Sequence, residues 1–242
     1  PFGQGTQRIE ETLAAHFPAA RIVRIDRDTT RRKNAWKDLR QAIHTQQVDI
    51  LVGTQILAKG HDFPNLSLVG ILNADTSLYS TDYRASERLF AQLMQVAGRA
   101  GRAEVPGHVL IQTEFPEHPL YRALQRHDYD SLAHAILTER KAAQFPPFVH
   151  QALLRAESHA MRDVLNFLQQ AARLIAYSSS IEMFDPVPAQ MVRLKGLERA
   201  HLLVQSTSRS QLQEFLGRWY TEINRLASHK IRWTLDVDPV EF

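Results

Sequence analysis

The run Val48-Asp49-Ile50-Leu51-Val52-Gly53 decides how the first half of this chain folds. It is short and almost entirely apolar, which is typical of a strand in a parallel sheet covered on both faces. Similar runs occupy residues 66–74 and 108–113, and a helical pattern lies between them at residues 82–97. Because strands alternate with helices, the sequence predicts a parallel sheet with right-handed crossovers.

Two helices and a strand are expected upstream of this run. Residues 5–17 carry apolar side chains at a spacing of four, and residues 21–26 alternate briefly as a short strand does. A second helix is expected around Trp36, Leu39 and Ile43, which share one helical face. The alternation of helix and strand therefore begins near the N-terminus.

The pattern changes after residue 113. Residues 117–143 have a helical pattern, and Phe145-Pro146-Pro147-Phe148 then interrupts the chain, since proline disfavours helix at the residue before it. Downstream, the pattern predicts strands at 150–158, 181–189, 201–206 and 231–237 and helices at 160–177 and 210–227. The order βαββαβ is typical of a ferredoxin-like α+β sandwich. We therefore expect an α/β lobe over residues 1–116, a helical linker over 117–148 and a C-terminal domain over 149–242.

The composition excludes several classes of site. The chain has 242 residues, 44% of them hydrophobic, and it contains no cysteine. Disulfides, thiolate catalysis and cysteine-ligated zinc are therefore excluded, and the eleven histidines show no metal-binding spacing. No apolar run approaches the roughly 18 residues of a membrane span. The first residues show neither a signal peptide nor an initiator Met, so we expect the chain to begin inside a longer cytoplasmic protein.

The net charge is weakly basic, at +3 from 29 Lys and Arg against 26 Asp and Glu. A denser basic cluster lies between Arg21 and Arg40. It can meet a polyanion, but Asp26, Asp28 and Asp38 lie within it, and on charge alone a solvated helix face is the favoured interpretation.

The strongest local signal is Gln95-Val96-Ala97-Gly98-Arg99-Ala100-Gly101-Arg102. Two arginines three residues apart follow a predicted helix and are separated by small residues, which allow a close approach of backbone to ligand. Guanidinium groups bind phosphate oxygens with two parallel hydrogen bonds. The alternative is a basic end of a helix, where arginine favours the helix dipole.

The second signal follows the strand at 48–53 directly, as Gly53-Thr54-Gln55-Ile56-Leu57-Ala58-Lys59-Gly60-His61-Asp62-Phe63. Ligands of open parallel α/β sheets bind at the carboxyl ends of strands. Free backbone N–H groups and the Thr54 hydroxyl suit a phosphate, and Asp62 can accept a hydrogen bond from a sugar hydroxyl. An ordinary turn with glycine at positive φ is the alternative.

The two segments resemble motifs V and VI of superfamily-2 nucleic-acid motors. The surrounding sequence resembles the PriA family of primosomal helicases. The resemblance is carried by Ile50–Gln55, Lys59–Asn65 and the Arg84-Ala85-x-Glu87-Arg88 that precedes the arginine motif. The resemblance extends from Gly5–Glu11 to the ending Arg232–Pro239, and Asn73 departs from it where the family carries Asp. It implies a RecA-like second helicase lobe followed by a small C-terminal domain.

The resemblance implies an ATP-dependent 3′→5′ DNA helicase that acts at stalled replication forks and helps reload the replicative helicase. Arg102 is then the arginine finger, with Arg99 beside it on the phosphates and Gln95 linking the ATP site to closure of the lobes. The resemblance assigns nucleotide and DNA contacts to the loop that follows the strand at 48–53. Gly60 and Asp62 face the nucleotide, and the DNA-contacting residues are Thr54, Gln55 and Lys59.

Two parts of a complete motor are absent from the sequence. It has neither a G-x-x-x-x-G-K-[ST] loop nor an Asp-Glu pair for Mg²⁺ after an apolar strand. By the resemblance, ATP and Mg²⁺ are held together with an upstream first lobe, and zinc belongs to an upstream cysteine module. The alternatives are a non-catalytic module that binds DNA or replication proteins, and an RNA motor.

A protein-binding site is expected at the start of the helix near residue 210. Helix N-termini attract anions, and Arg209 and Gln213 are one turn apart on one face. The family binds single-stranded DNA-binding protein, whose tail is acidic and ends in an apolar residue, as well as other primosome proteins and forked or single-stranded DNA. We therefore expect Arg209 and Gln213 to contact this tail, with Trp219 or Leu216 near an apolar pocket. A plain capped surface helix is the alternative.

Overall fold

The computed structural model describes residues 4–26, 35–54, 63, 65–78, 80, 82–101, 106–227 and 230–240. The chain divides into two compact units, residues 1–132 and 133–242, and each is described by itself. None of the described helices is long and apolar enough to cross a membrane.

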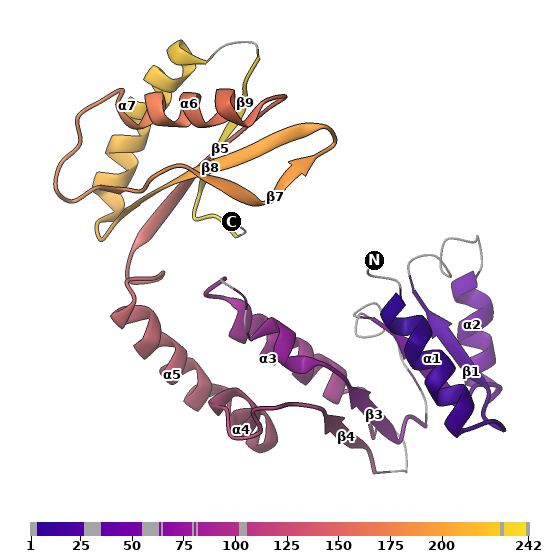
Figure 1. Cartoon of the computed structure of the whole chain (residues 1–242). Helices are drawn as coiled ribbons and strands as arrows, with labels where there is room; N and C mark the ends of the chain where they lie inside the picture. The colour runs from indigo at the N-terminus through magenta and orange to yellow at the C-terminus, as the bar shows by residue number, and fades with distance from the viewer. Residues whose placement is uncertain are drawn as a thin grey trace. The chain divides into compact units, whose positions relative to one another are not determined.

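The first unit begins with two helices and two strands in alternation (Figure 1). These are α1 (Gln4–His16), β1 (Ile22–Ile25), α2 (Ala35–His44) and β2 (Ile50–Gly53). β1 and β2 pair in parallel, with Ile22 opposite Ile50, as the alternation predicts. Arg21 and Asp49, the residues just before β1 and β2, are joined by two hydrogen bonds. Arg21 Nη2 donates to Asp49 Oδ1 at 2.7 Å and Arg21 Nε donates to Asp49 Oδ2 at 2.8 Å.

A second parallel pair follows. β3 (Leu68–Ile71) leads through the 3-10 turn η3 (Ala74–Ser77) and α3 (Ala85–Ala97) to β4 (His108–Ile111), and Leu68 lies opposite His108. The prediction that these strands are buried on both faces is wrong. Their burial alternates, and Leu68 and Leu110 are 53% and 62% exposed, because the described part of the chain covers only one face of the pair.

The segment predicted to be helical at 117–143 consists of two helices, α4 (Pro119–Arg126) and α5 (Tyr129–Ala142). His127, with φ of 53°, ends α4 in a left-handed conformation, and Asp128 starts α5 by accepting the Ser131 N–H at 3.0 Å. Asp is a preferred helix cap, and this local signal marks the break.

The second unit contains an antiparallel sheet with two helices packed on one of its faces (Figure 1). The elements in chain order are β5 (His150–Ser158), α6 (Met161–Ala172), β6 (Glu182–Met183), β7 (Val187–Leu194), β8 (Leu197–Ser206), α7 (Arg209–Leu226) and β9 (Arg232–Val237). Their order in the sheet is β6-β8-β5-β9, the ferredoxin-like arrangement, and the fold-class prediction is confirmed.

One edge of this sheet differs from the prediction. The strand expected at 181–189 is broken into β6 and β7, and both pair with β8. β7 turns into β8 through Lys195 and Gly196, with φ of 49° and 84°. A two-residue turn with two positive φ values matches the twist of a hairpin, so the edge continues to Leu194.

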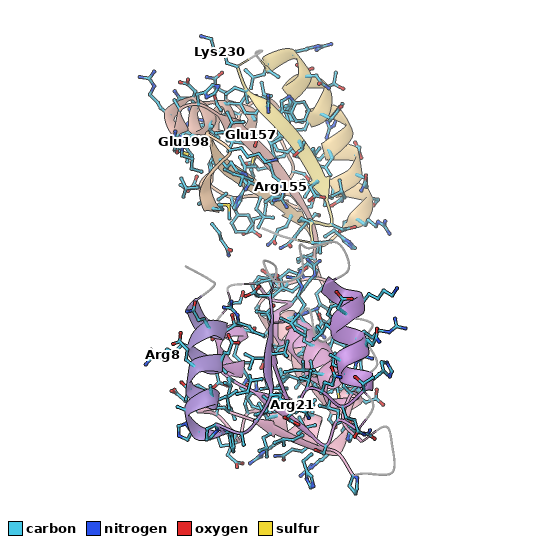
Figure 2. All side chains as sticks on the ribbon, turned by 90° about the vertical axis from the view of Figure 1, so that its right-hand side faces the viewer. Arg8, Arg21, Arg155, Glu157, Glu198 and Lys230 are labelled. Atoms are coloured by element: carbon cyan, nitrogen blue, oxygen red, sulfur yellow. The ribbon has the colours of Figure 1, made fainter. Side chains whose placement is uncertain are left out.

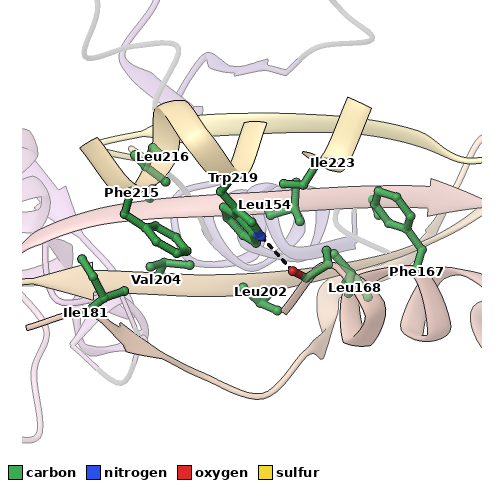
Figure 3. Packing of buried hydrophobic residues seen from close by; sticks show 14 of the residues in the cluster. Leu154, Phe167, Leu168, Ile181, Leu202, Val204, Phe215, Leu216, Trp219 and Ile223 are labelled. Atoms are coloured by element: carbon green, nitrogen blue, oxygen red, sulfur yellow. Dashed lines mark hydrogen bonds between the residues drawn. The ribbon is translucent and has the colours of Figure 1, made fainter. Parts of the chain in front are cut away.

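The core of this domain lies between the sheet and its two helices. α6 and α7 pack against the face that carries Leu154, Leu202 and Val204 (Figure 3). Trp219 of α7 is fully buried, and its Nε1–H donates to the Ala171 carbonyl of α6 at 2.7 Å. This bond satisfies the one polar atom of the indole, so the ring contributes its whole area to the core.

Candidate functional site

The loop predicted to hold nucleotide and DNA begins directly after β2. Thr54 follows Gly53 and is exposed at the carboxyl end of the strand. Gln55, Lys59, Gly60 and Asp62 lie outside the described residues. The structure therefore places the first residue of this candidate site and leaves the other four assignments as predictions.

The arginine motif begins on the last turn of α3. Gln95 is exposed on the helix, which ends at Ala97, and the Gly98 N–H donates to the Met94 carbonyl at 2.9 Å. Arg99 is half-buried just beyond the helix, and its N–H donates to the Val96 carbonyl at 3.0 Å. Gln95 lies on the last turn of α3 and Arg99 in the turn that follows it, so both are near this end of the helix. Arg102 lies outside the described residues.

The small residues of this motif have a structural role within the chain. Gly101 has a φ of 74°, and its N–H donates to the Leu66 carbonyl at 3.1 Å. A Cβ on Gly107 would lie 2.3 Å from the Gly101 nitrogen and 2.6 Å from the Ala100 Cβ. The backbone at Gly107, just before β4, therefore packs directly against Ala100 and Gly101. The small residues at these two positions make room for this segment of the same chain.

This contact between Gly107 and the motif helps to fix the position of the Arg99 backbone. The motif is hydrogen-bonded to the segment before β3 through Leu66, and the next bond, from the His108 N–H to the Ser67 carbonyl at 2.8 Å, joins the two strands there. Gln95 and Arg99 thus belong to the β3–β4 pair, whereas Thr54 follows the β1–β2 pair.

A polar cluster at the carboxyl ends of β3 and β4 was not predicted. Asp75 Oδ1 accepts hydrogen bonds from the Thr113 hydroxyl at 2.6 Å and the Tyr121 hydroxyl at 2.7 Å, and Oδ2 accepts the Glu114 N–H at 2.7 Å. Burial pushes the pKa of the Asp75 carboxyl upward, but these three hydrogen bonds and the nearby His118 outweigh it and hold the pKa below its ordinary value.

The pKa of Tyr121, the tyrosine of this cluster, is shifted upward. Burial, followed by the hydrogen bond to Asp75, raises the pKa of Tyr121 to about 12. The phenol is therefore a fixed donor at neutral pH. The cluster ties η3, the end of β4 and α4 together, and we assign it a structural role that supports the edge where parallel strands present ligands.

Asn73 stands where the family sequence carries Asp, and the backbone conformation gives a local reason for an amide side chain there. Its φ of 54° places it in the left-handed region before η3, and its side chain makes no capping hydrogen bond. Asn is one of the few residues other than glycine that adopt this conformation readily.

Asp82 organises the start of α3. Its Oδ1 accepts the Arg84 N–H at 2.9 Å, and its Oδ2 binds Arg88 Nη1 at 2.7 Å. Arg84 lies over the Tyr83 ring at 4.6 Å. The arginines of the segment before the motif are thus engaged in positioning the helix that carries Gln95.

In the described part of the basic cluster at 21–40, Arg21 and Arg24 lie at β1 and not on a helix, and both are paired with carboxylates. Arg21 is paired with Asp49, and Arg24 lies between Glu10 and Asp26 at 3.3 and 3.4 Å. The residues from Arg27 to Lys33 lie outside the described residues. Among those that are described, no group of His, Asp and Glu gathers as a metal site does.

The predicted protein-binding site lies at the start of α7. Ser208 caps the helix, with its hydroxyl accepting the Gln211 N–H at 3.5 Å, and Arg209 and Gln213 are both exposed. The expectation that Trp219 or Leu216 borders an apolar pocket beside them is wrong. Both side chains are buried in the core, at 0% and 4% exposure, because they lie on the face of α7 that packs on the sheet.

Two family models match this chain in succession. Residues 2–104 match the helicase conserved C-terminal domain, and residues 141–240 match the primosomal protein N C-terminal domain. The second match coincides with the antiparallel sheet and its helices. The first contains both candidate segments, from Thr54 to Arg102.

Relatives from distant bacteria are similar over nearly the whole chain. Replication restart protein PriA of Haemophilus influenzae is 41% identical over 239 residues, covering 98% of this chain and 33% of that protein. The proteins of the same name from Bacillus subtilis and Synechocystis are 35% and 38% identical, over 98% and 99% of this chain. The chain covers 30% and 28% of these two proteins, and so spans about a third of the length of the relatives it matches.

Proposed function

Because the chain belongs to the family of replication restart protein PriA, we propose that it is the C-terminal part of an ATP-dependent 3′→5′ DNA helicase that restarts stalled replication forks. The observation that carries this proposal is the succession of the two family matches, with the described part of the arginine motif, Gln95 to Gly101, hydrogen-bonded at the end of α3. The domain limits we propose are a helicase lobe at 1–116, a helical linker at 117–148 and a C-terminal domain at 149–242.

The lobe contributes part of an ATP site. The described residues fit this use, since Gln95 is exposed on the last turn of α3 and Arg99 follows in a turn whose N–H donates to the Val96 carbonyl. Arg102 is the proposed arginine finger, and Gly60 and Asp62 are the proposed nucleotide contacts. ATP with Mg²⁺ supplies the phosphoryl group whose hydrolysis drives the motor, and the guanidinium groups of this chain stabilise negative charge on it.

The DNA contacts we propose follow β2. Thr54 is exposed where the strand ends, and its hydroxyl and N–H are suited to a backbone phosphate, with Gln55 and Lys59 following. Such contacts carry no sequence information, which suits a motor that moves along any strand.

The proposed protein partner is single-stranded DNA-binding protein, through Arg209 and Gln213. Both side chains are exposed at the start of an 18-residue helix, where free N–H groups and the dipole favour a carboxylate. Other primosome proteins remain proposed partners without assigned residues, and zinc is proposed only for the upstream part of the longer protein.

The deciding experiment measures DNA-stimulated ATP hydrolysis and strand separation by the longer protein with Arg102 intact and replaced by alanine. A DNA motor requires both activities to depend on Arg102. If DNA binding persists while neither activity is present in either protein, the chain belongs to a non-catalytic binding module instead.

A further inference from the structure

The C-terminal sheet has a second face, opposite the one that α6 and α7 cover. Side chains alternate along a strand, so Ala152, Leu154 and Ala156 of β5 enter the core while Arg155 and Glu157 project to the other side. Figure 2 labels Arg155 and Glu157 on this domain.

The strand register places charged side chains in rows across this face. In one row, Arg199 of β8, Glu157 of β5 and Arg232 of β9 are direct partners. In the next row, His201, Arg155 and Thr234 are partners. These six residues line a pocket of about 320 Å³ together with Ala156, Ala189, Ala200 and Trp233.

The pocket holds more positive charge than its carboxylates neutralise. Arg232 Nη1 lies 3.8 Å from Glu157 Oε1, and Arg155 Nη2 lies 3.3 Å from Asp236 Oδ2. Arg199 forms no ion pair within the described residues, so three guanidinium groups face two carboxylates. Burial lowers the pKa of His201, and the positive charges of Arg155 and Arg199 lower it further.

The pair of Arg232 with Glu157 leaves the Arg232 guanidinium able to bind another anion. The Arg232–Glu157 pair is long at 3.8 Å and the Arg232 side chain is 77% exposed, whereas Arg155 is 27% exposed and hydrogen-bonded to Asp236 at 3.3 Å. An exposed pair such as Arg232–Glu157 contributes roughly 0–1 kcal/mol, so an arriving phosphate can share or replace Glu157 at little cost, while Asp236 keeps Arg155 in place.

We infer that the Arg155–Arg199–Arg232 pocket binds a phosphate group of a nucleic-acid backbone. The inference rests on the DNA binding proposed above and adds a contact on the C-terminal domain. Guanidinium forks match phosphate oxygens, and Thr234 adds a hydroxyl donor. Trp233, the largest ring among the lining residues, packs against the core, so the contact we infer is to the phosphate and not to a base.

The first test measures affinity by fluorescence anisotropy, with the 242-residue chain and a labelled oligothymidine at several salt concentrations. Arg199→Gln and Arg232→Gln are each expected to weaken binding about 3- to 10-fold, and each to reduce the slope of log affinity against log salt by about 0.7, the value for one lost phosphate contact on a single strand. Arg162→Gln is the matched control, because Arg162 lies on α6 with its side chain 85% exposed. Circular dichroism confirms that each variant is folded.

The second test reads the pocket directly through the imidazole resonances of His201, assigned with His201→Gln. Oligothymidine is expected to shift them and to raise the pKa of His201, because a phosphate adds negative charge beside it. Inorganic phosphate, added at the same phosphate concentration, is expected to produce a much smaller shift. An equal response would make free phosphate the ligand and overturn the assignment to nucleic acid.

The two proposals fail in distinguishable ways. If the chain binds oligothymidine while His201 is unmoved and both variants match Arg162→Gln, the pocket inference is wrong and the proposed DNA binding stands. If the wild-type chain binds no oligothymidine and His201 is unmoved, both the pocket inference and DNA binding by this chain are wrong.

Discussion

The hydroxyl of Tyr121 donates a 2.7 Å hydrogen bond to the carboxylate of Asp75, which lies 46 residues earlier in the chain. The bond joins α4 to the turn that follows β3. Thr113 and the Glu114 N–H bind the same carboxylate, so one side chain holds three segments together.

Tyr121→Phe is expected to lower the free energy of unfolding by about 1–3 kcal/mol, the cost of removing a hydrogen bond to a charged group. Chemical denaturation at neutral pH measures the loss. Tyr129→Phe is the control, since Tyr129 is 52% exposed and its ring contact with Phe90 survives the change. Equal stability of the two variants would contradict the structural role of the cluster.

The stability that Asp75 contributes should depend on pH. Its pKa is lowered in the folded chain, so the contribution is present above the unfolded value of about 3.9 and is lost as pH falls through the folded pKa. Asp75→Asn should therefore be less stable than wild type at neutral pH, with the difference shrinking below about pH 4. Denaturation of both proteins across acidic pH measures this difference, and a gap that widens in acid would refute the assigned direction.

Gly107→Ala should destabilise the first unit by about 1–3 kcal/mol, the range for overpacking, because the new methyl would meet the backbone at Gly101. Hydrogen exchange at the Gly101 amide should accelerate as its bond to Leu66 weakens. Gly70→Ala is the matched control, since nothing lies within 4 Å of its added Cβ. A Gly107→Ala protein that matches this control would show that the two backbones do not pack closely.

Arg102→Ala in the longer protein should reduce DNA-stimulated ATP turnover by roughly 10³–10⁵, the range for arginine fingers in other nucleotide hydrolases. Nucleotide binding should survive better than turnover. The 242-residue chain alone should show no turnover, because its sequence has no phosphate-binding Walker loop. Steady-state hydrolysis and nucleotide titration measure these outcomes, and near-normal turnover in the variant would remove Arg102 from the site.

Arg209→Ala should weaken binding of the acidic tail peptide of single-stranded DNA-binding protein by about 10-fold or more, since a buried or charge-assisted contact to a carboxylate contributes about 1.5–3 kcal/mol. Calorimetric titration with the free-acid and amidated peptides measures it. Arg218→Ala, on the same helix and pairing with Glu214 at 4.0 Å, is the control. If the peptide binds Arg209→Ala as tightly as this control, the tail contacts another surface.

The elements and their types could be predicted from residues a few positions apart. The apolar run at 48–53, the helical spacing of Leu89 and Leu93 and the βαββαβ order all reappear in the structure. Predictions were incomplete where a local pattern was ambiguous: the stretch at 117–143 is helical as predicted but is broken at His127, and the edge strand at 181–189 is broken and extended. Of the candidate site, the positions of Thr54, Gln95 and Arg99 at the ends of their elements agree with expectation.

The sequence by itself determined the periodicity of each element, the family resemblance in the loops after β2 and α3, and the absence of cysteine. Only the tertiary structure decided that Tyr121 meets Asp75, that Gly107 lies against Gly101, and that Arg199, Glu157 and Arg232 share a row. The reason is physical. Periodicity is encoded by neighbours within one turn or one pleat, whereas register and chain crossings depend on packing summed over segments far apart in the chain, which no short stretch of sequence contains.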